Sequence, residues 1–550
     1  MRTLALACGL GWSLLLGQSS SVLAADADVP SEKPLVAART DTAVVISRDL
    51  KPAFESWLKR RAAQGHAAVL IDNSGTSEAI REQIVRQSGQ HPLRFVVLVG
   101  DSPVTGAADP ANHSRTIPTF LPPAKVNVNF GPDKDIAADN PYGDLDNDGV
   151  PELAVGRITA DTPAELSAII DKIVAYEDSA DFGPWRRKLN FVAGMGGFGQ
   201  VADSVLESTA KKFIAEGLSP SYALTMTYGS WRSPYCPDPR RFHDVAVDRL
   251  NEGSLFWVYI GHGQRHALDR VKLPDGEQHI FGARDVAKLR AQRGLPIAFF
   301  LACYTGAFDD KRDCLAEDLL RAPGAPVAVV SGSRVTMPYA MTVMATAVVD
   351  ACFVERQPTL GEVLLAAKRN MLLSPRDDET SKSMDLLART MNPNSSDLAA
   401  ERQEHVLMFN LIGDPLLKLR QPQALEIEAP ATAAPGETIH VVGRSPVEGA
   451  CTIELVVRRD RLTFRPPVRK NYDGSDAALS AYEAIYQRAN DPCLDSAACA
   501  ISAGTFAVDL RVPDDARGPC HVRAYVEGPA DFALGSADLT IGRAAASQSR

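Results

Sequence analysis

Two apolar segments of the sequence each end in a side chain that can take part in nucleophilic catalysis. Residues 255–263 read Leu-Phe-Trp-Val-Tyr-Ile-Gly-His-Gly, and residues 296–306 read Pro-Ile-Ala-Phe-Phe-Leu-Ala-Cys-Tyr-Thr-Gly. Short apolar runs of this kind are typical of strands buried in a parallel sheet, and ligands gather beyond the carboxyl ends of such strands. If the two strands are neighbours, His262 and Cys303 lie side by side at one edge of the sheet.

The chemistry that this pair supports is attack by a thiolate on a carbonyl carbon. A thiol becomes a strong nucleophile when a neighbouring imidazole takes its proton or stabilises the anion. Gly263 lets the backbone come close to a substrate carbonyl, and the N–H groups of Gly263 and Cys303 are candidates for an oxyanion hole. The alternative interpretation is that His262 is a turn residue and Cys303 a buried core thiol.

The elements that must position this pair alternate between strands and helices. The chain is expected to form a strand at 42–47, a helix at 50–64 and a second strand at 67–71. A similar pattern resumes at residue 189 and continues to about residue 420. Such alternation predicts an α/β fold in which helices cover the faces of a parallel sheet.

The C-terminal part of the sequence has a different texture. Short alternating strands, such as 438–442 and 505–510, are separated by turns rich in proline and glycine. This pattern predicts a small antiparallel β-sandwich, with residues 465–500 as a loop or helical insertion. Four cysteines fall in this part and leave three disulfide pairings open: Cys451, Cys493, Cys499 and Cys520.

Composition and the N-terminus indicate an exported globular protein. The chain has 550 residues, of which 45% are hydrophobic and 23% charged, so several folded units are expected. Its net charge of -10 offers no electrostatic footprint for nucleic acid, so no nucleic-acid partner is expected. Arg2, the apolar run 4–17 and Val-Leu-Ala at 22–24 are typical of a signal peptide. Because that run is shorter than the roughly 20 residues of a membrane span, we expect no stable span in a secreted, periplasmic or cell-surface mature chain.

An acidic loop indicates a metal site. Asp144, Asp146 and Asp148 alternate along the chain and precede Gly149. Three such carboxylates can wrap a hard cation, and the glycine permits the turn, so the loop indicates structural Ca²⁺. Val155 stands where an EF-hand carries its glutamate, which excludes that motif. Glu152, shortly after the loop, could be a further ligand of this ion. The alternative is a solvated, aspartate-rich turn.

A glycine-rich segment competes with the peptidase interpretation. Residues 194–199 read Gly-Met-Gly-Gly-Phe-Gly between a predicted strand and helix, which is the dinucleotide-binding pattern. The acidic residue that this pattern requires is absent from the end of the next strand, Tyr-Ala-Leu-Thr-Met-Thr-Tyr-Gly. We therefore interpret the segment as a loop near the edge of the sheet, and expect no cofactor to be required for the chemistry.

Together, these motifs resemble the gingipain-like cysteine peptidases of the caspase-like clan. The hallmark of that family is an apolar strand ending in His-Gly and a later one ending in Ala-Cys, as at 259–263 and 301–306. The resemblance runs from about residue 40 to residue 420. Further matches follow the family's order: Val-Leu-Val-Gly-Asp (97–101), Asn-Pro-Tyr-Gly-Asp-Leu-Asp-Asn-Asp-Gly (140–149), Val-Gly-Arg (155–157), Cys-Leu-Ala-Glu-Asp-Leu-Leu (314–320) and Leu-Ile-Gly-Asp-Pro (411–415).

The resemblance implies an enzyme that hydrolyses peptide bonds in protein or peptide substrates through a thioester. Cys303 would be the nucleophile and His262 the acid and base, and Glu152 stands where a carboxylate that orients the histidine would fall. Asp161 and Glu165 lie in a region where an Arg-selective member would place a pocket acid. A catalytically silent adhesion or binding protein on the same fold is the alternative function.

The resemblance also implies a domain order. A caspase-like, parallel-sheet α/β catalytic unit of two subdomains is expected to precede an immunoglobulin-like β-sandwich. The expected boundaries are a signal peptide (1–24), a short N-terminal segment (25–41), an N-terminal α/β subdomain (42–180), the catalytic subdomain (181–421) and the sandwich (422–545).

Overall fold

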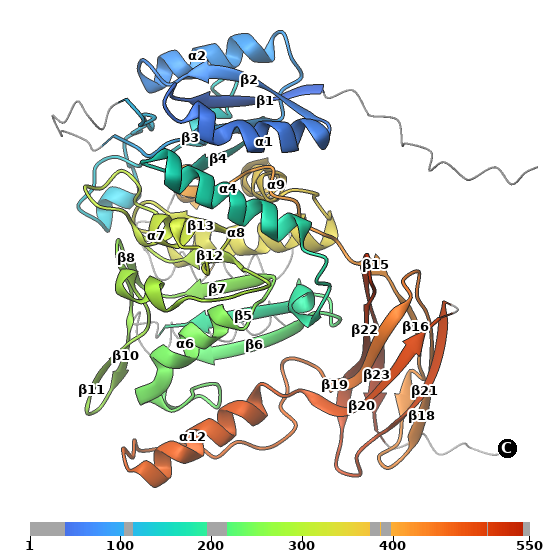
Figure 1. Cartoon of the computed structure of the whole chain (residues 1–550). Coiled ribbons are helices and arrows are strands. Elements are labelled where there is room, and N and C mark those ends of the chain that lie inside the picture. The colour runs from blue at the N-terminus through green and yellow to red at the C-terminus, as the bar shows by residue number, and fades with distance from the viewer. Residues whose placement is uncertain are drawn as a thin grey trace, which may run out of the picture. The chain divides into compact units, whose positions relative to one another are not determined.

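A ten-stranded sheet forms the centre of the α/β part of the chain (Figure 1). The structure is a computed structural model, and it describes residues 39–103, 114–194, 217–373, 386, 398–502 and 504–542. The strands follow the order β2-β1-β3-β4-β14-β13-β12-β7-β5-β6. Their bounds are β1 Arg39–Ile46, β2 His66–Asp72, β3 Phe95–Val99, β4 Ala154–Ile158, β5 Lys188–Ala193, β6 Ala223–Tyr228, β7 Phe256–Ile260, β12 Ile297–Leu301, β13 Ala328–Gly332 and β14 Phe409–Ile412.

The two halves of this sheet run in opposite directions. Strands β1 to β4 and β14 are parallel to one another, and so are β13, β12, β7, β5 and β6. Only the pair β13–β14 is antiparallel. The predicted parallel sheet is therefore correct within each half. The reversal arises because β14, the last strand of the unit in the sequence, inserts between β4 and β13.

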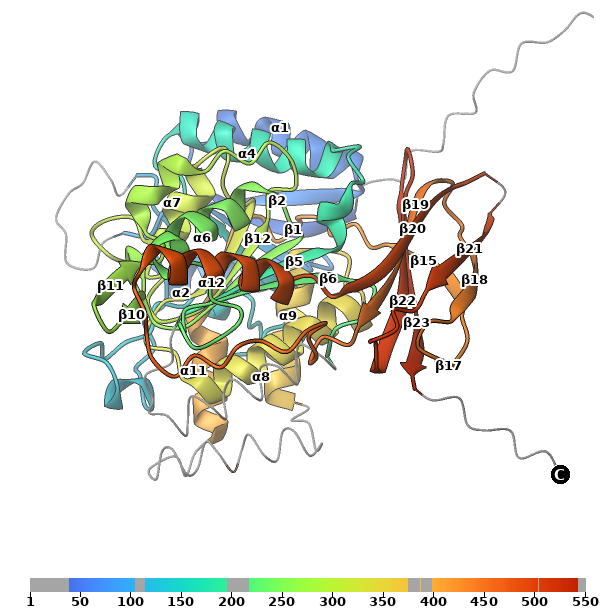
Figure 2. The ribbon, with the colours of Figure 1, turned by 90° about the horizontal axis from the view of Figure 1, so that it is seen from below.

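Helices cover both faces of the sheet. Figure 2 shows α1, α4, α6 and α7 on one face and α8, α9 and α11 on the other. The alternation within β1 reflects this arrangement, since Val44 and Ile46 belong to one buried cluster and Ala43 and Val45 to another. The helices are α1 Lys51–Ala63, α2 Ser77–Ser88, α4 Pro163–Asp178, α6 Phe242–Asn251, α7 Leu315–Arg321, α8 Pro338–Val349, α9 Leu360–Leu373 and α11 Leu398–Met408.

The C-terminal part forms a β-sandwich with a hydrophobic core of its own. One sheet has the order β15-β23-β22-β19-β20, with β17 also on β23, and the other has the order β16-β18-β21. The immunoglobulin-like character of this sandwich stays a prediction. Its elements are β15 Gln423–Ala424, β16 Glu426–Glu428, β17 Thr432–Ala433, β18 Thr438–Arg444, β19 Gly449–Val457, α12 Asp476–Ala489, β20 Cys493–Ile501, β21 Thr505–Arg511, β22 Gly518–Glu527 and β23 Phe532–Ile541.

Strand register narrows the disulfide pairings that the sequence leaves open. Cys451 on β19 and Cys499 on β20 are direct partners across the sheet. Burial, followed by the neighbouring Cys499 thiol, raises the pKa of Cys451 to about 12. By contrast, Cys493 and Cys520 lie on β20 and β22, which β19 separates. All four of these cysteines are free thiols in the structure, and the disulfide pairing stays a prediction, with Cys451 and Cys499 as direct neighbours in the sheet.

The predicted signal peptide, 1–24, lies outside the described residues. Among the helices that the structure does describe, none combines the length and the apolar character needed to cross a membrane.

Candidate active site

The register of β7 and β12 brings together the two segments that the sequence singles out. The strands are parallel, and Ile260 pairs with Leu301. His262 and Cys303 therefore each lie two residues beyond the same register pair. The approach of the two backbones is close, because a Cβ atom on Gly263 would lie 2.6 Å from the Cys303 carbonyl oxygen. The His262 side chain is exposed and Cys303 is half-buried.

Two hydrogen bonds fix the backbone that carries the histidine. The Tyr259 hydroxyl donates to the His262 carbonyl oxygen at 2.9 Å, and the Asp269 N–H donates to the same oxygen at 3.1 Å. Between these residues the chain forms a short hairpin of β8, Gly263–Gln264, and β9, Ala267–Leu268. The loop after β7 is thus tied back to its own strand, which restrains the position of the imidazole.

Cys303 lies on a sharply turning backbone. The residue after it, Tyr304, has a φ of 59°, a left-handed conformation that is uncommon for residues other than glycine. Its N–H donates to the Arg334 carbonyl oxygen at 3.0 Å, and its hydroxyl donates to Asp133 at 2.6 Å. Such strain costs on the order of 1–3 kcal/mol and persists only where the surroundings enforce it, often at active sites.

The sulfur atom of Cys303 receives a backbone donor. The Thr336 N–H donates to Sγ at 3.3 Å, and the Thr336 hydroxyl oxygen lies 3.6 Å from the same atom. Thr336 follows β13, the neighbour of β12 in the sheet. An amide directed at sulfur favours negative charge there. The Thr336 carbonyl oxygen lies 3.7 Å from the same sulfur and accepts a hydrogen bond from the Cys303 thiol.

The two predicted oxyanion-hole residues lie next to one another. Among the described residues, the Cys303 N–H has no backbone acceptor within hydrogen-bond distance. A Cβ atom on Gly263 would lie 2.9 Å from both Ala302 Cβ and Thr305 Cγ2. Close packing is therefore one reason for glycine at position 263. The predicted approach of a substrate carbonyl would be a second, separate reason.

Glu152 does not lie near the histidine. It precedes β4, and β14, β13 and β12 separate that strand from β7. With neighbouring strands about 4.8 Å apart, four steps amount to about 19 Å. Its carboxylate instead accepts a hydrogen bond from the Leu145 N–H at 2.7 Å. The hypothesis that Glu152 orients His262 is wrong, because the turn before β4 binds this carboxylate into the acidic loop.

The structure brings together two of the three predicted aspartates of the acidic loop, with Glu152 in place of the third. Carboxylate oxygens of Asp144, Asp146 and Glu152 lie within 4.8 Å of one another. Asp148 is outside this group, and its carboxylate accepts the Val150 N–H at 2.7 Å. Burial, together with the neighbouring aspartates, raises the pKa of Glu152.

The two candidate pocket acids have other partners. Asp161 forms an ion pair with Arg321 at 3.2 Å. The Glu165 carboxylate accepts the Asp161 N–H at 2.9 Å, at the start of α4. Both follow β4, which runs opposite in direction to β12. Asp161 therefore connects the start of α4 with α7, which follows β12, and Glu165 caps the chain before α4.

Sequence reasoning misses three residues of the site: Thr336, Tyr259 and Asp269. Thr336 was detectable in principle, since it follows the carboxyl end of an apolar strand, as Cys303 does. Tyr259 and Asp269 act through contacts with the His262 carbonyl, which no spacing rule reveals. Of the glycine-rich segment, only Gly194 is described, and a Cβ atom there would lie 2.9 Å from the Tyr259 hydroxyl; residues 195–199 lie outside the described part.

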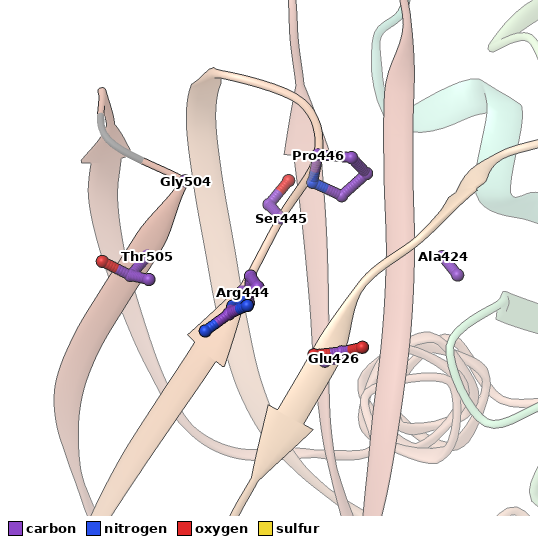
Figure 3. A pocket seen from close by; sticks show the side chains of 7 residues that line it. All are labelled: Ala424, Glu426, Arg444, Ser445, Pro446, Gly504 and Thr505. Carbon is purple, nitrogen blue, oxygen red and sulfur yellow. The ribbon is translucent and has the colours of Figure 1, made fainter. Parts of the chain in front are cut away.

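A separate hollow of about 520 Å³ lies in the sandwich (Figure 3). Its hydroxyl groups include that of Ser445, which donates to the Val447 carbonyl oxygen at 2.7 Å. Neither a thiol nor an imidazole is among the residues that line it. The lining residues are Ala424, Glu426, Arg444, Ser445, Pro446, Gly504 and Thr505.

Curated relatives share the catalytic part of the chain. Gingipain R1 of Porphyromonas gingivalis is 25% identical over 376 residues, which is 64% of this chain and 34% of that protein. Lys-gingipain of the same organism is 22% identical over 290 residues, which is 50% of this chain and 14% of that protein. The chain thus spans about a third or less of the length of these relatives.

Solved structures confirm the predicted fold class, a caspase-like α/β catalytic unit. The crystal structure of the Arg specific cysteine proteinase gingipain R (RGPB) aligns with a TM-score of 0.50 at 16% identity, over 94% of this chain and 100% of that one. The complex of Porphyromonas gingivalis RgpB pro- and mature domains gives 0.51 at 16%, over 91% and 100%.

A family model extends the likeness across both halves of the sheet. The model described as peptidase family C25 matches residues 36–420, from the start of β1 to beyond β14. Since this match covers well over half of the chain, the protein belongs to peptidase family C25, the gingipain-like cysteine peptidases.

Proposed function

We propose that the chain is an exported cysteine endopeptidase that hydrolyses peptide bonds in protein substrates. The observation that carries this proposal is the pairing of β7 with β12, which sets His262 and Cys303 equally far beyond one register pair. Membership of a peptidase family supports it. The sequence Val-Leu-Ala at 22–24, after an apolar run, supports export.

The proposed reaction proceeds through a thioester. His262 takes the proton from Cys303 Sγ, and the thiolate attacks the scissile carbonyl carbon. The N–H groups of Cys303 and Gly263 donate to the oxyanion of the tetrahedral intermediate. As that intermediate collapses, the C–N bond breaks and His262 gives its proton to the leaving amine. Water, deprotonated by His262, then attacks the thioester and releases the carboxylic acid and the Cys303 thiol.

The residues around the pair support these steps. The Thr336 N–H, 3.3 Å from Sγ, stabilises the thiolate before attack. Tyr259 and Asp269 hold the His262 carbonyl oxygen, so the backbone that carries the imidazole is fixed in place. Positioning of this kind contributes to rate because reacting groups start close to the geometry of attack.

A peptide-library digest tests the proposal. The wild-type chain should cleave peptide bonds, and Cys303→Ala and His262→Ala should lose this activity while melting at the wild-type temperature. Cys493→Ala is the matched control, because Cys493 is half-buried as Cys303 is, and burial raises its pKa to about 11. If wild type and Cys303→Ala digest the library equally, Cys303 is not the nucleophile. A folded wild type that cleaves nothing would favour the adhesion or binding alternative.

We also propose that the acidic loop binds structural Ca²⁺. The grouped carboxylates of Asp144, Asp146 and Glu152 support this proposal, since oxygen ligands from alternate positions suit a hard cation. Ca²⁺ should raise the melting temperature of chelator-treated protein. Asp146→Asn should weaken this shift, and Asp148→Asn, which changes a carboxylate outside the group, should preserve it. Equal shifts in both variants and the wild type would exclude the site.

A further inference from the structure

Two imidazoles and a carboxylate meet where a hairpin packs against α6. The hairpin consists of β10, Arg270–Leu273, and β11, Gly276–His279 (Figure 1). His243 lies on α6, His279 ends β11, and Asp285 lies on the 3-10 helix Ala283–Lys288. One ligand atom from each residue lies within 4.8 Å of the others. We propose that His243, His279 and Asp285 bind a divalent transition-metal ion of the Zn²⁺ class.

The tautomer of His243 is set for coordination. Its Nδ1 lies 2.9 Å from the Ile280 carbonyl oxygen, and since a carbonyl can only accept, Nδ1 carries the proton. The lone pair of a neutral ring is then on Nε2, which lies 3.5 Å from Asp285 Oδ1. Metal-binding histidines characteristically donate their second ring nitrogen to a carbonyl or carboxylate in this way.

The distances between ligand atoms are near those that a tetrahedral ion requires. Bonds of about 2.1 Å from zinc to nitrogen or oxygen place two ligands about 3.4 Å apart. The 3.5 Å between His243 and Asp285 meets this value. His279 Nε2 lies 2.6 Å from the other oxygen of this carboxylate, Asp285 Oδ2, and donates a hydrogen bond to it, so a metal ion would replace this proton and widen the contact. His279 is exposed enough to move, whereas Asp285 is 5% exposed and is held by the Gly282 N–H at 3.0 Å.

A cation already occupies part of this position. The Lys288 ammonium lies 2.8 Å from His243 Nε2 and 2.9 Å from Asp285 Oδ1, the two atoms that would bind the metal. The cluster therefore stabilises positive charge at this point. Because the Lys288 side chain is 55% exposed, it can move into solvent when an ion enters. The structure thus predicts competition between the lysine and the metal.

The location links the ion to the active-site loop. Residues 270–279 directly follow β9 and Asp269, whose N–H holds the His262 carbonyl. An ion at this site would tie the hairpin to α6 and to the 3-10 helix, and so restrain the loop that carries His262. The donor set of two imidazoles and one carboxylate favours Zn²⁺ over Ca²⁺, which prefers oxygen ligands.

Metal titration of the full chain tests the proposal. Cys303→Ala is the background, because a cysteine–histidine pair can itself bind zinc. Calorimetry of chelator-treated protein should show one Zn²⁺ site with imidazole and carboxylate ligands, and Co²⁺ should give the visible absorption of a tetrahedral complex. His279→Ala should weaken binding more than about tenfold, given that loss of an outer-shell partner alone costs 10- to 100-fold. Lys288→Met should tighten binding, since it removes the competing ammonium.

The matched control is His440→Ala, which removes an exposed histidine 2.8 Å from Asp509 on the sandwich. It should bind zinc as the background does. Melting curves without metal establish that His279→Ala is folded. No binding by the background, or equal binding by the background and a folded His279→Ala variant, would overturn the proposal. Hydrogen exchange of residues 270–279 should slow with Zn²⁺ in the background and stay unchanged in His279→Ala.

Discussion

The two halves of the central sheet use polar residues in different ways. In the half formed by β1 to β4, Arg157 is fully buried and forms a double hydrogen bond to the buried Asp139. In the half formed by β7 and β12, the residues after the strands are an exposed His262 and a half-buried Cys303. Residues at the strand ends are therefore buried and paired in one half, and at least partly accessible to solvent in the other, where we propose the catalytic pair.

The difference comes from what covers the strand ends. In the first half, Arg157 Nη1 donates to the carbonyl oxygens of Gly100, Asp101 and Ile117, at 3.2, 3.1 and 2.9 Å, and so fastens the chain beyond β3. In the second half, the small residue Gly263 leaves room for the backbone of Cys303. The first edge is filled by the protein itself, whereas at the second edge the His262 side chain is exposed.

The largest expected effect on stability follows from breaking the buried pair of the first half. Arg157→Met leaves the Asp139 carboxylate buried without its cation. Such a loss costs about 3–5 kcal/mol, to be measured as the free energy of unfolding in urea. Arg270→Met is the control, because its pair with Glu277 is exposed and should change stability by less than about 1 kcal/mol. Equal effects of the two variants would remove the contrast between the halves.

The second effect is the pH-dependent contribution of His405 to the free energy of unfolding. His405 lies at the boundary between the two halves of the sheet. Burial lowers the pKa of His405 to about 4, and its Nε2 accepts the N–H of Met337, the residue after Thr336. The unfolded chain, with a histidine pKa near 6.5, binds this proton more readily than the folded one. The stability that the neutral His405 ring contributes is therefore fully present above about pH 6.5 and is lost as the pH falls towards 4. The loss is roughly 3 kcal/mol at most.

His405→Gln isolates this contribution, since glutamine does not titrate. Unfolding free energies at pH 7 and pH 4.5 should differ less in the variant than in the wild type, once the carboxylates common to both are subtracted. An identical pH dependence in the two proteins would show that His405 is not buried as the neutral ring.

The smallest expected change in stability concerns the contact between the Gly263 and Cys303 backbones in the second half of the sheet. Gly263→Ala places a Cβ atom 2.6 Å from the Cys303 carbonyl oxygen, so the two backbones must separate slightly. We expect kcat/KM to fall about 10- to 100-fold, with a loss of stability of about 1 kcal/mol. Gly542→Ala is the control, because a Cβ atom there meets no atom within 4 Å. Unchanged activity in Gly263→Ala would show that this contact does not position the pair.

Much of the second half is predictable from the sequence. The strands before His262 and Cys303 are continuous apolar runs, and the structure forms them as β7 and β12. Their neighbouring positions follow from sheet pairing, a long-range property that periodicity does not specify. The motifs of the matched family supplied that information.

The first half shows where local reasoning fails. The change of strand direction at β14 depends on where this last strand joins the sheet, between β4 and β13. A local sequence pattern does not specify that position. Glu152 was misassigned for the same reason, because its distance from His262 depends on strand order. Its true neighbours, Asp144 and Asp146, are close in the sequence, so proximity along the chain was the better guide there.

The most direct test of the central claim is the rate at which an iodoacetamide probe alkylates Cys303 near neutral pH, in wild type and in His262→Ala. Cys493, equally half-buried, is the reference within the same molecule. We expect Cys303 to react much faster than Cys493, and His262→Ala to remove this difference. Equal alkylation of Cys303 in the two proteins would contradict the proposed catalytic pair.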